Sequence, residues 1–197
     1  MALCPLFTGS NPPGFTISEV ARPSCRIARS PPIDRWTPYS KGMPALAGTQ
    51  RLIIVCGLPG AGKTTFARDV ADRVGAIRLS ADEWLDFLQI GRSEKTRERV
   101  EALQWKLAQD LLGRGLAVII EWGTWARSER DVLRTGARAL GAAVELHFLD
   151  GAIDVLLERL HRRNRESPPI TRDELLRWAQ LFEVPTPEEI ALFDSPC

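Results

Sequence analysis

The chain has 197 residues, with 26 basic and 25 acidic side chains and a formal net charge of +1. This length suffices for one α/β domain with a substantial core, and the balanced charge argues against a general affinity for nucleic acid or membrane surfaces. The four cysteines form no C-x-x-C pair and no apolar run reaches the length of a membrane span, so we expect a cytoplasmic protein without disulfides, zinc or membrane contact.

Residues 1–48 differ in composition from the rest of the chain. The first fifty residues hold eight of the fourteen prolines and show neither helical nor alternating periodicity. Such a segment buries too little apolar surface to offset the entropy lost on ordering. We therefore expect a disordered extension followed by one domain over residues 49–197. An alternative start of the protein is Met43, which stands eight residues before the first predicted strand.

Residues 57–64 read GLPGAGKT, which is the pattern G-x-x-x-x-G-K-[ST] of a phosphate-binding loop. An apolar, β-branched run at 51–56 precedes it, and a segment with apolar residues at helical spacing follows it at 64–73. Strand, loop and helix direct backbone N–H groups and a helix N-terminus at phosphate. We therefore expect ATP here, with Lys63 on its β- and γ-phosphates and Thr64 on Mg²⁺. The predicted nucleotide contacts are Gly57, Leu58, Pro59, Gly60, Ala61, Gly62, Lys63, Thr64 and Thr65.

Strands and helices alternate along the rest of the chain. Apolar runs predict strands at 76–79, 116–120 and 144–149, and helical spacing predicts a long helix over 93–112. We expect Ser80 and Ser128 to cap two further helices, and Thr171 and Thr186 to open two short ones through capping boxes. The alternation predicts a doubly wound, mostly parallel sheet of four to five strands, with helices on both faces.

Acidic residues follow two of these strands, at the edge of a parallel sheet where ligands bind. Asp82 comes shortly after the second strand, and Glu121 directly follows five apolar residues of the third. We expect Glu121 to lie near the metal or the substrate. Asp82 has a simpler alternative role, since negative charge stabilises a helix N-terminus, and the adjacent Glu83 is easily confused with it.

The phosphate loop, Asp82, Glu121 and an arginine-rich segment after the fourth strand together resemble the small P-loop kinases. The nearest groups are the polynucleotide-kinase-like, zeta-toxin-like and chloramphenicol-phosphotransferase-like proteins, including chains called AAA-family ATPases. The resemblance covers about residues 50–193. It implies transfer of the ATP γ-phosphate to a hydroxyl, with Asp82 as general base and Glu121 at Mg²⁺ or substrate. Polynucleotide-kinase-like chains usually carry Asp-Thr-Asn where residues 121–124 read EWGT, which weakens any inference of nucleic-acid-end specificity.

The arginine-rich segment resembles the lid of these kinases, which we expect around residues 159–170. Arg159 and Arg163 are one helical turn apart and share a face. The resemblance implies that both reach the γ-phosphate and act in catalysis with Lys63 and Asp82. The alternative is a solvated basic helix end.

Aromatic and basic residues accompany the strand ends on the expected acceptor side. Trp84, Trp122 and Trp125 suit a ring-bearing or apolar substrate, whereas Arg127 and Arg130 could bind an anionic one or simply be solvated. Trp105 lies on the long amphipathic helix and is expected to serve packing.

Three other classes with this loop lack support in the sequence. A GTPase needs Asn-Lys-x-Asp, an ABC ATPase needs L-S-G-G-Q, and an AAA+ motor needs an acidic pair after the third strand; none is present. We predict a kinase that phosphorylates a small molecule. A polynucleotide 5′-hydroxyl kinase and a non-catalytic ATP-binding switch or ATPase stay as alternatives, and the oligomeric state stays open.

Overall fold

The computed structural model describes residues 50–91, 93–166 and 168–196. All of these residues lie in one compact unit, Gly42–Cys197. The predicted extension over 1–48 and the alternative start Met43 lie outside the described residues.

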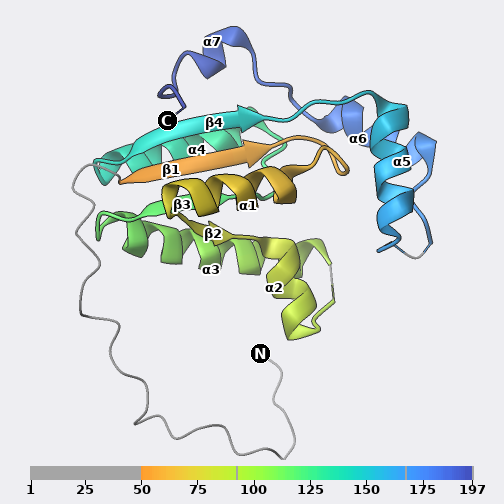
Figure 1. The fold of residues 1–197 in the computed structure, drawn as a ribbon, viewed down its shortest axis with the longest axis horizontal. Coiled ribbons are helices and arrows are strands. Elements are labelled where there is room, and N and C mark those ends of the chain that lie inside the picture. Colours follow the sequence, from red (N-terminus) through yellow and green to blue (C-terminus); the bar gives the residue numbers. More distant parts are fainter. Residues whose placement is uncertain (1–49, 92, 167, 197) are drawn as a thin grey trace, which may run out of the picture. The chain divides into compact units, whose positions relative to one another are not determined.

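A four-stranded parallel sheet lies at the centre of this unit (Figure 1). Its strands, in the spatial order β2-β3-β1-β4, are β1 (Arg51–Cys56), β2 (Ile77–Leu79), β3 (Ala117–Ile120) and β4 (Ala143–Phe148). Strand β1 pairs with β3 on one side and β4 on the other, in parallel register from Arg51 opposite Ala117 and Ala143. The predicted α/β class and parallel sheet are confirmed, and all carboxyl ends of the strands meet at one edge.

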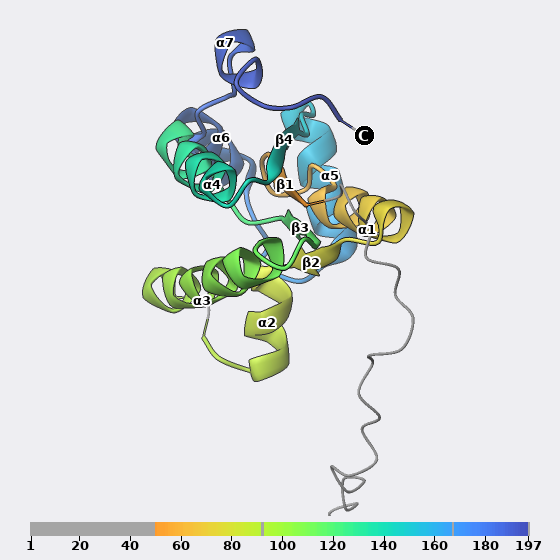
Figure 2. The same cartoon turned by 90° about the vertical axis from the view of Figure 1, so that its left-hand side faces the viewer.

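Helices cover both faces of the sheet. They are α1 (Lys63–Val74), α2 (Ala81–Leu88), α3 (Glu94–Leu112), α4 (Arg127–Ala139), α5 (Ile153–Arg163), α6 (Arg172–Leu181) and α7 (Pro187–Ile190). Figure 2 shows α3 and α4 on one side of the sheet and α1 on the other. None of the described helices is long and apolar enough to cross a membrane.

Strand β1 shows why both faces are covered. Successive side chains of a strand point to opposite faces. Leu52 and Ile54 pack in a cluster with α2, α3 and α4, whereas Ile53 and Val55 pack in a second cluster with α1. All four are fully buried, which explains why the strand reads as a continuous apolar run.

Of the four predicted helix caps, the Thr171 capping box forms, the Thr186 box forms only through its threonine, and the two serine caps do not form. Thr171 and Glu174 make the predicted reciprocal capping box of α6, and Thr186 accepts a hydrogen bond from the backbone N–H of residue 189 at the start of α7. The expectation for Ser80 is wrong, because its side chain makes no capping bond to α2. The expectation for Ser128 is also wrong, because α4 begins at Arg127, one residue earlier. The Glu129 carboxylate instead accepts a hydrogen bond from the backbone N–H of Ala126, which precedes the helix.

Candidate functional site

The phosphate loop (residues 57–65) joins β1 to α1 and depends on two glycines. Gly57 has φ 141° and Gly60 has φ 84°, in the region that side chains rarely adopt. A Cβ on Gly57 would overlap the carbonyl oxygen of Leu149, and one on Gly60 would lie 2.6 Å from that of Leu156. The loop backbone thus packs directly against the segment after β4 and against α5.

A cavity of about 760 Å³ opens over this loop at the carboxyl edge of the sheet, and we call it the phosphate cleft. Its size is that of a site for a nucleotide-sized ligand. It brings together predicted residues from four separate parts of the chain, namely Lys63, Thr64, Thr65, Asp82, Glu121, Arg159 and Arg163.

Lys63 is fixed within the loop. Its Nζ donates hydrogen bonds to the carbonyl oxygens of Gly57, at 2.8 Å, and Leu58, at 3.0 Å. Burial lowers the pKa of Lys63 from 10.5 to about 8, and the negative charges of Asp82 and Glu121 oppose that shift. The ammonium is therefore held in place, with a pKa that added negative charge would raise.

This pKa predicts a pH dependence of ATP binding. The phosphates favour protonated Lys63 and raise its pKa, so binding should take up a proton above pH 8. Affinity should then fall by up to about tenfold per pH unit above that pKa. Calorimetric titration with ATP in buffers of different ionisation enthalpy checks the proton uptake. Lys63→Arg is the control, since an arginine stays charged and should flatten the profile; a flat profile in the unmodified protein would contradict the prediction.

The structure separates the two neighbouring acids at the start of α2. The Glu83 carboxylate forms ion pairs with Arg68, at 2.7 Å, and with Arg78. Asp82 lines the phosphate cleft with its side chain 53% exposed and receives a hydrogen bond from Arg97 Nη2. Of the two, Asp82 is the acid that a ligand in the cleft can reach.

Glu121 is buried at the end of β3, and one of its two carboxylate oxygens has no hydrogen-bond partner among the described residues. Its side chain is 2% exposed, and Oε1 accepts from Arg78 Nη1. Oε2 accepts no hydrogen bond from any described group. An unsatisfied oxygen of a buried carboxylate costs free energy unless a ligand binds to it. Arg78 lies inside β2 and was not among the site residues predicted from the sequence. The feature that could have identified it is a single basic residue within a short apolar strand.

These residues fit a magnesium ion. Oxygen ligands are what Mg²⁺ prefers, and it is usually held by one or two protein groups together with substrate phosphates. Glu121 Oε2 and the Thr64 hydroxyl supply such groups at one cleft. Among the described residues no cluster of three or more His, Cys, Asp or Glu side chains could hold a metal by itself.

The basic end of α5 lies across the cleft from Asp82 and Glu121. Arg159 Nη1 is 3.4 Å from the carbonyl oxygen of Gly60, and Arg163 forms an ion pair with Glu166. Both arginines line the cleft. The predicted lid over 159–170 includes residue 167, which lies outside the described residues.

The predicted substrate contacts are not gathered in the phosphate cleft. Trp84 packs, partly buried, against the core cluster of α2, α3 and α4, and the ring of Trp125 lies 6.2 Å from that of Trp178. Arg127 is half exposed, and its Nε lies 3.7 Å from Asp131 of the same helix. None of the three lines the cleft.

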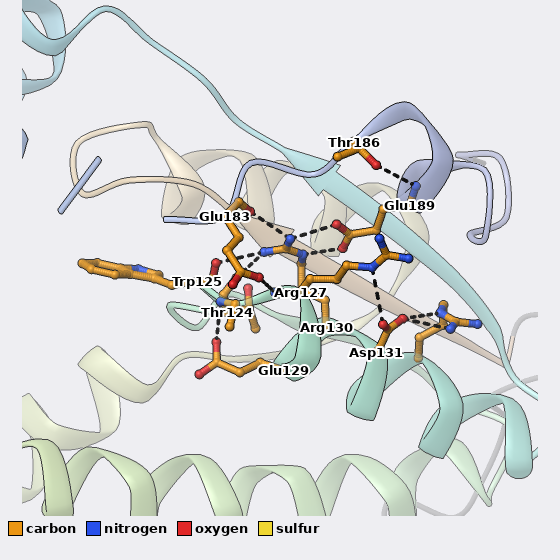
Figure 3. Close-up of polar contacts among 11 residues, drawn as sticks. Thr124, Trp125, Arg127, Glu129, Arg130, Asp131, Glu183, Thr186 and Glu189 are labelled. Carbon is orange, nitrogen blue, oxygen red and sulfur yellow. Dashed lines mark hydrogen bonds and ion pairs between the residues drawn. The ribbon is translucent and has the colours of Figure 1, made fainter. Parts of the chain in front are cut away.

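Arg130, a predicted substrate contact, is buried away from the phosphate cleft and is engaged within the protein. Its side chain is fully buried, and it donates to both carboxylate oxygens of Glu189 at 2.6 and 2.9 Å. It also donates to the carbonyl oxygens of Thr124, Trp125 and Glu183 (Figure 3). These bonds use its donors internally and tie the loop after β3 to the C-terminal segment.

Solved structures share this fold. A sugar kinase from a Janibacter species is 28% identical, with a TM-score of 0.52, over 71% of this chain and 81% of that one. A gluconokinase from Sinorhizobium meliloti is 23% identical, with a TM-score of 0.52, over 72% and 80%. A chain of the Pnkp1/Rnl/Hen1 RNA repair complex is 24% identical, with a TM-score of 0.56, over 66% and 43%. The resemblance to small P-loop kinases is confirmed.

Sequence comparisons agree. An uncharacterized protein of Mycobacterium tuberculosis is 33% identical in an alignment 135 residues long, which covers 58% of this chain and 26% of that protein. The chain thus matches about a quarter of the length of this curated relative. The profile of the family described as AAA domain matches residues 52–185. The chain belongs to this AAA domain family.

Proposed function

We propose that this protein is an ATP-dependent kinase that transfers the γ-phosphate to a hydroxyl of a small molecule. The observation that carries the proposal is the phosphate cleft. There Lys63, the accessible carboxylate of Asp82 and the buried Oε2 of Glu121 meet over one loop. The 28% identical sugar kinase adds support.

Each residue has a physical task in such a reaction. Phosphoryl transfer needs mainly positioning and neutralisation of charge. The loop N–H groups and Lys63 bind the phosphates, and Asp82 accepts the proton of the attacking hydroxyl. Arg159 and Arg163 stabilise negative charge on the transferred group. Thr64 and Glu121 would hold Mg²⁺, which neutralises phosphate charge when bound.

The guanidinium of Arg97 pairs with the Asp82 carboxylate and places a positive charge beside the proposed base. A chain that only bound ATP would need neither Asp82 nor an acceptor. The near-neutral net charge favours a small molecule over a polynucleotide 5′-hydroxyl end as the acceptor.

Transfer of label from γ-labelled ATP tests the proposal. The purified chain with Mg²⁺ is offered pooled nucleosides, neutral sugars, sugar acids, aminoglycosides, amphenicols and 5′-hydroxyl oligonucleotides. Label should move to one small-molecule pool and be lost in both Lys63→Ala and Asp82→Asn. Transfer to the oligonucleotides would favour the polynucleotide kinase. Tight ATP binding without transfer to any pool would favour the non-catalytic switch.

A further inference from the structure

A second cavity, of about 290 Å³, lies between α3 and α4 beside the loop that follows β3, and we call it the α3–α4 cavity. Trp105, Trp122, Val132 and Leu133 form its apolar wall. Both rings are fixed: Trp122 Nε1 donates to Gln104 Oε1 at 2.6 Å, and Trp105 packs closely against Gly136 of α4. Such a wall suits a flat apolar group.

Thr124 lines this cavity and carries a buried hydroxyl that has no hydrogen-bond partner within the described part of the chain. The residue is 6% exposed. Its φ is +33°, an unfavourable conformation for a β-branched residue. Arg130 Nη1 donates to its carbonyl oxygen at 3.0 Å and holds it there (Figure 3). Strain that positions a polar group is typical of a ligand site.

Two carboxylates determine which charge a ligand in the cavity can carry. Glu101 and Glu129 both line it. Burial raises the pKa of Glu101, opposed by Arg97, and the negative charges of Glu129 and Asp82 raise it further. Since both groups repel an anion, a neutral or cationic ligand is favoured.

Two links connect residues of the α3–α4 cavity with residues of the phosphate cleft. Arg97 donates to Asp82 in the cleft and lies 3.5 Å from Oε1 of Glu101 at the cavity. The successive residues Glu121 and Trp122 line the cleft and the cavity respectively. One arginine side chain therefore links Glu101 of the cavity to Asp82, the proposed base.

We propose that the α3–α4 cavity binds the phosphoryl acceptor, a neutral or cationic ring-bearing alcohol whose second polar group bonds to Thr124 Oγ1. This inference rests on the proposed kinase function. The acceptor oxygen forms a bond to the γ-phosphorus, the bond from that phosphorus to the bridging oxygen breaks, and ADP leaves with the electron pair. For this step the reacting hydroxyl has to extend from the cavity into the phosphate cleft, where its proton passes to Asp82. Anionic sugar acids and nucleic-acid ends are excluded by Glu101 and Glu129.

Matched small probes test the charge class. Saturation-transfer NMR is run with three para-substituted benzyl alcohols, which carry an aminomethyl, a hydroxymethyl or a carboxylate group. The first two should bind, and the carboxylate should bind at least about tenfold more weakly. Equal binding of the carboxylate, or binding of none of the three, would overturn the proposal.

Variants locate the binding. Thr124→Val should weaken binding of the hydroxymethyl probe about tenfold and leave the thermal midpoint unchanged or raised, because no protein hydrogen bond is lost. A lower midpoint with unchanged binding would mean a structural threonine and overturn the assignment. Ala102→Trp fills the cavity from α3 and should abolish binding, whereas Leu103→Trp changes an exposed neighbour outside the lining and should not.

The acceptor role is separated from the kinase function by label transfer. If an acceptor is phosphorylated equally well by Ala102→Trp, the kinase proposal stands and the acceptor assignment fails. If the probes bind as expected but no compound is ever phosphorylated, the acceptor role and the kinase proposal fail together, and only the charge class of the ligand is upheld.

Discussion

Asp82→Asn should lower the rate of phosphoryl transfer by roughly a hundredfold to ten-thousandfold and leave the affinity for MgATP within about twofold. Asparagine keeps the shape of the side chain but cannot accept the proton of the attacking hydroxyl. Asp82 is half exposed in the phosphate cleft, where its carboxylate pairs with Arg97. The change therefore acts on the chemical step, and steady-state rates with a saturating acceptor measure it.

Glu83→Gln is the matched control for this change. Glu83 adjoins Asp82 but is engaged by Arg68 and Arg78, so its variant should keep most of the transfer rate. Both variants are compared at pH 7, below the pKa of about 8 that Lys63 shows. Loss of Asp82 removes a negative charge that raises the pKa of Lys63. At higher pH the variant would therefore lose the charge on Lys63 as well as the proposed base, and the two losses could not be separated. Equal loss of activity in both variants would contradict the role of Asp82 as base.

Arg130→Met should lower the free energy of unfolding by about 3–5 kcal/mol. Methionine fills much of the volume but leaves the Glu189 carboxylate, which is 1% exposed, buried without its partner. The carbonyl oxygens of Thr124, Trp125 and Glu183 lose donors as well. Chemical denaturation followed by tryptophan fluorescence measures the loss.

Two further variants test the cause of that loss. Arg127→Met lies on the same helix with its side chain 47% exposed, and should change the stability by no more than about 0.5 kcal/mol. Adding Glu189→Met to Arg130→Met should restore part of the stability, since replacing both members of a buried ion pair is often tolerated. A loss below about 1 kcal/mol for Arg130→Met would contradict the structural role.

The pattern of amino acids along the chain was enough to predict the sheet, the phosphate loop and the acids at the edge of the sheet. Each of these depends on neighbours in the chain: apolar runs form strands, glycines allow the loop of 57–65, Glu121 directly follows β3, and Asp82 comes shortly after β2. Parallel strands then bring their carboxyl ends to one edge wherever the helices lie. Local pattern was sufficient for this part of the site.

Contacts between side chains far apart in the sequence could not be predicted and became visible in the three-dimensional structure. Arg130 reads as a surface arginine until α7 brings Glu189, 59 residues away, against it. Trp105 reads as a packing residue until α3, α4 and the end of β3 enclose a cavity with Trp122 and Thr124. Side-chain partners depend on how distant segments pack, and a pattern that repeats every few residues carries no record of that packing.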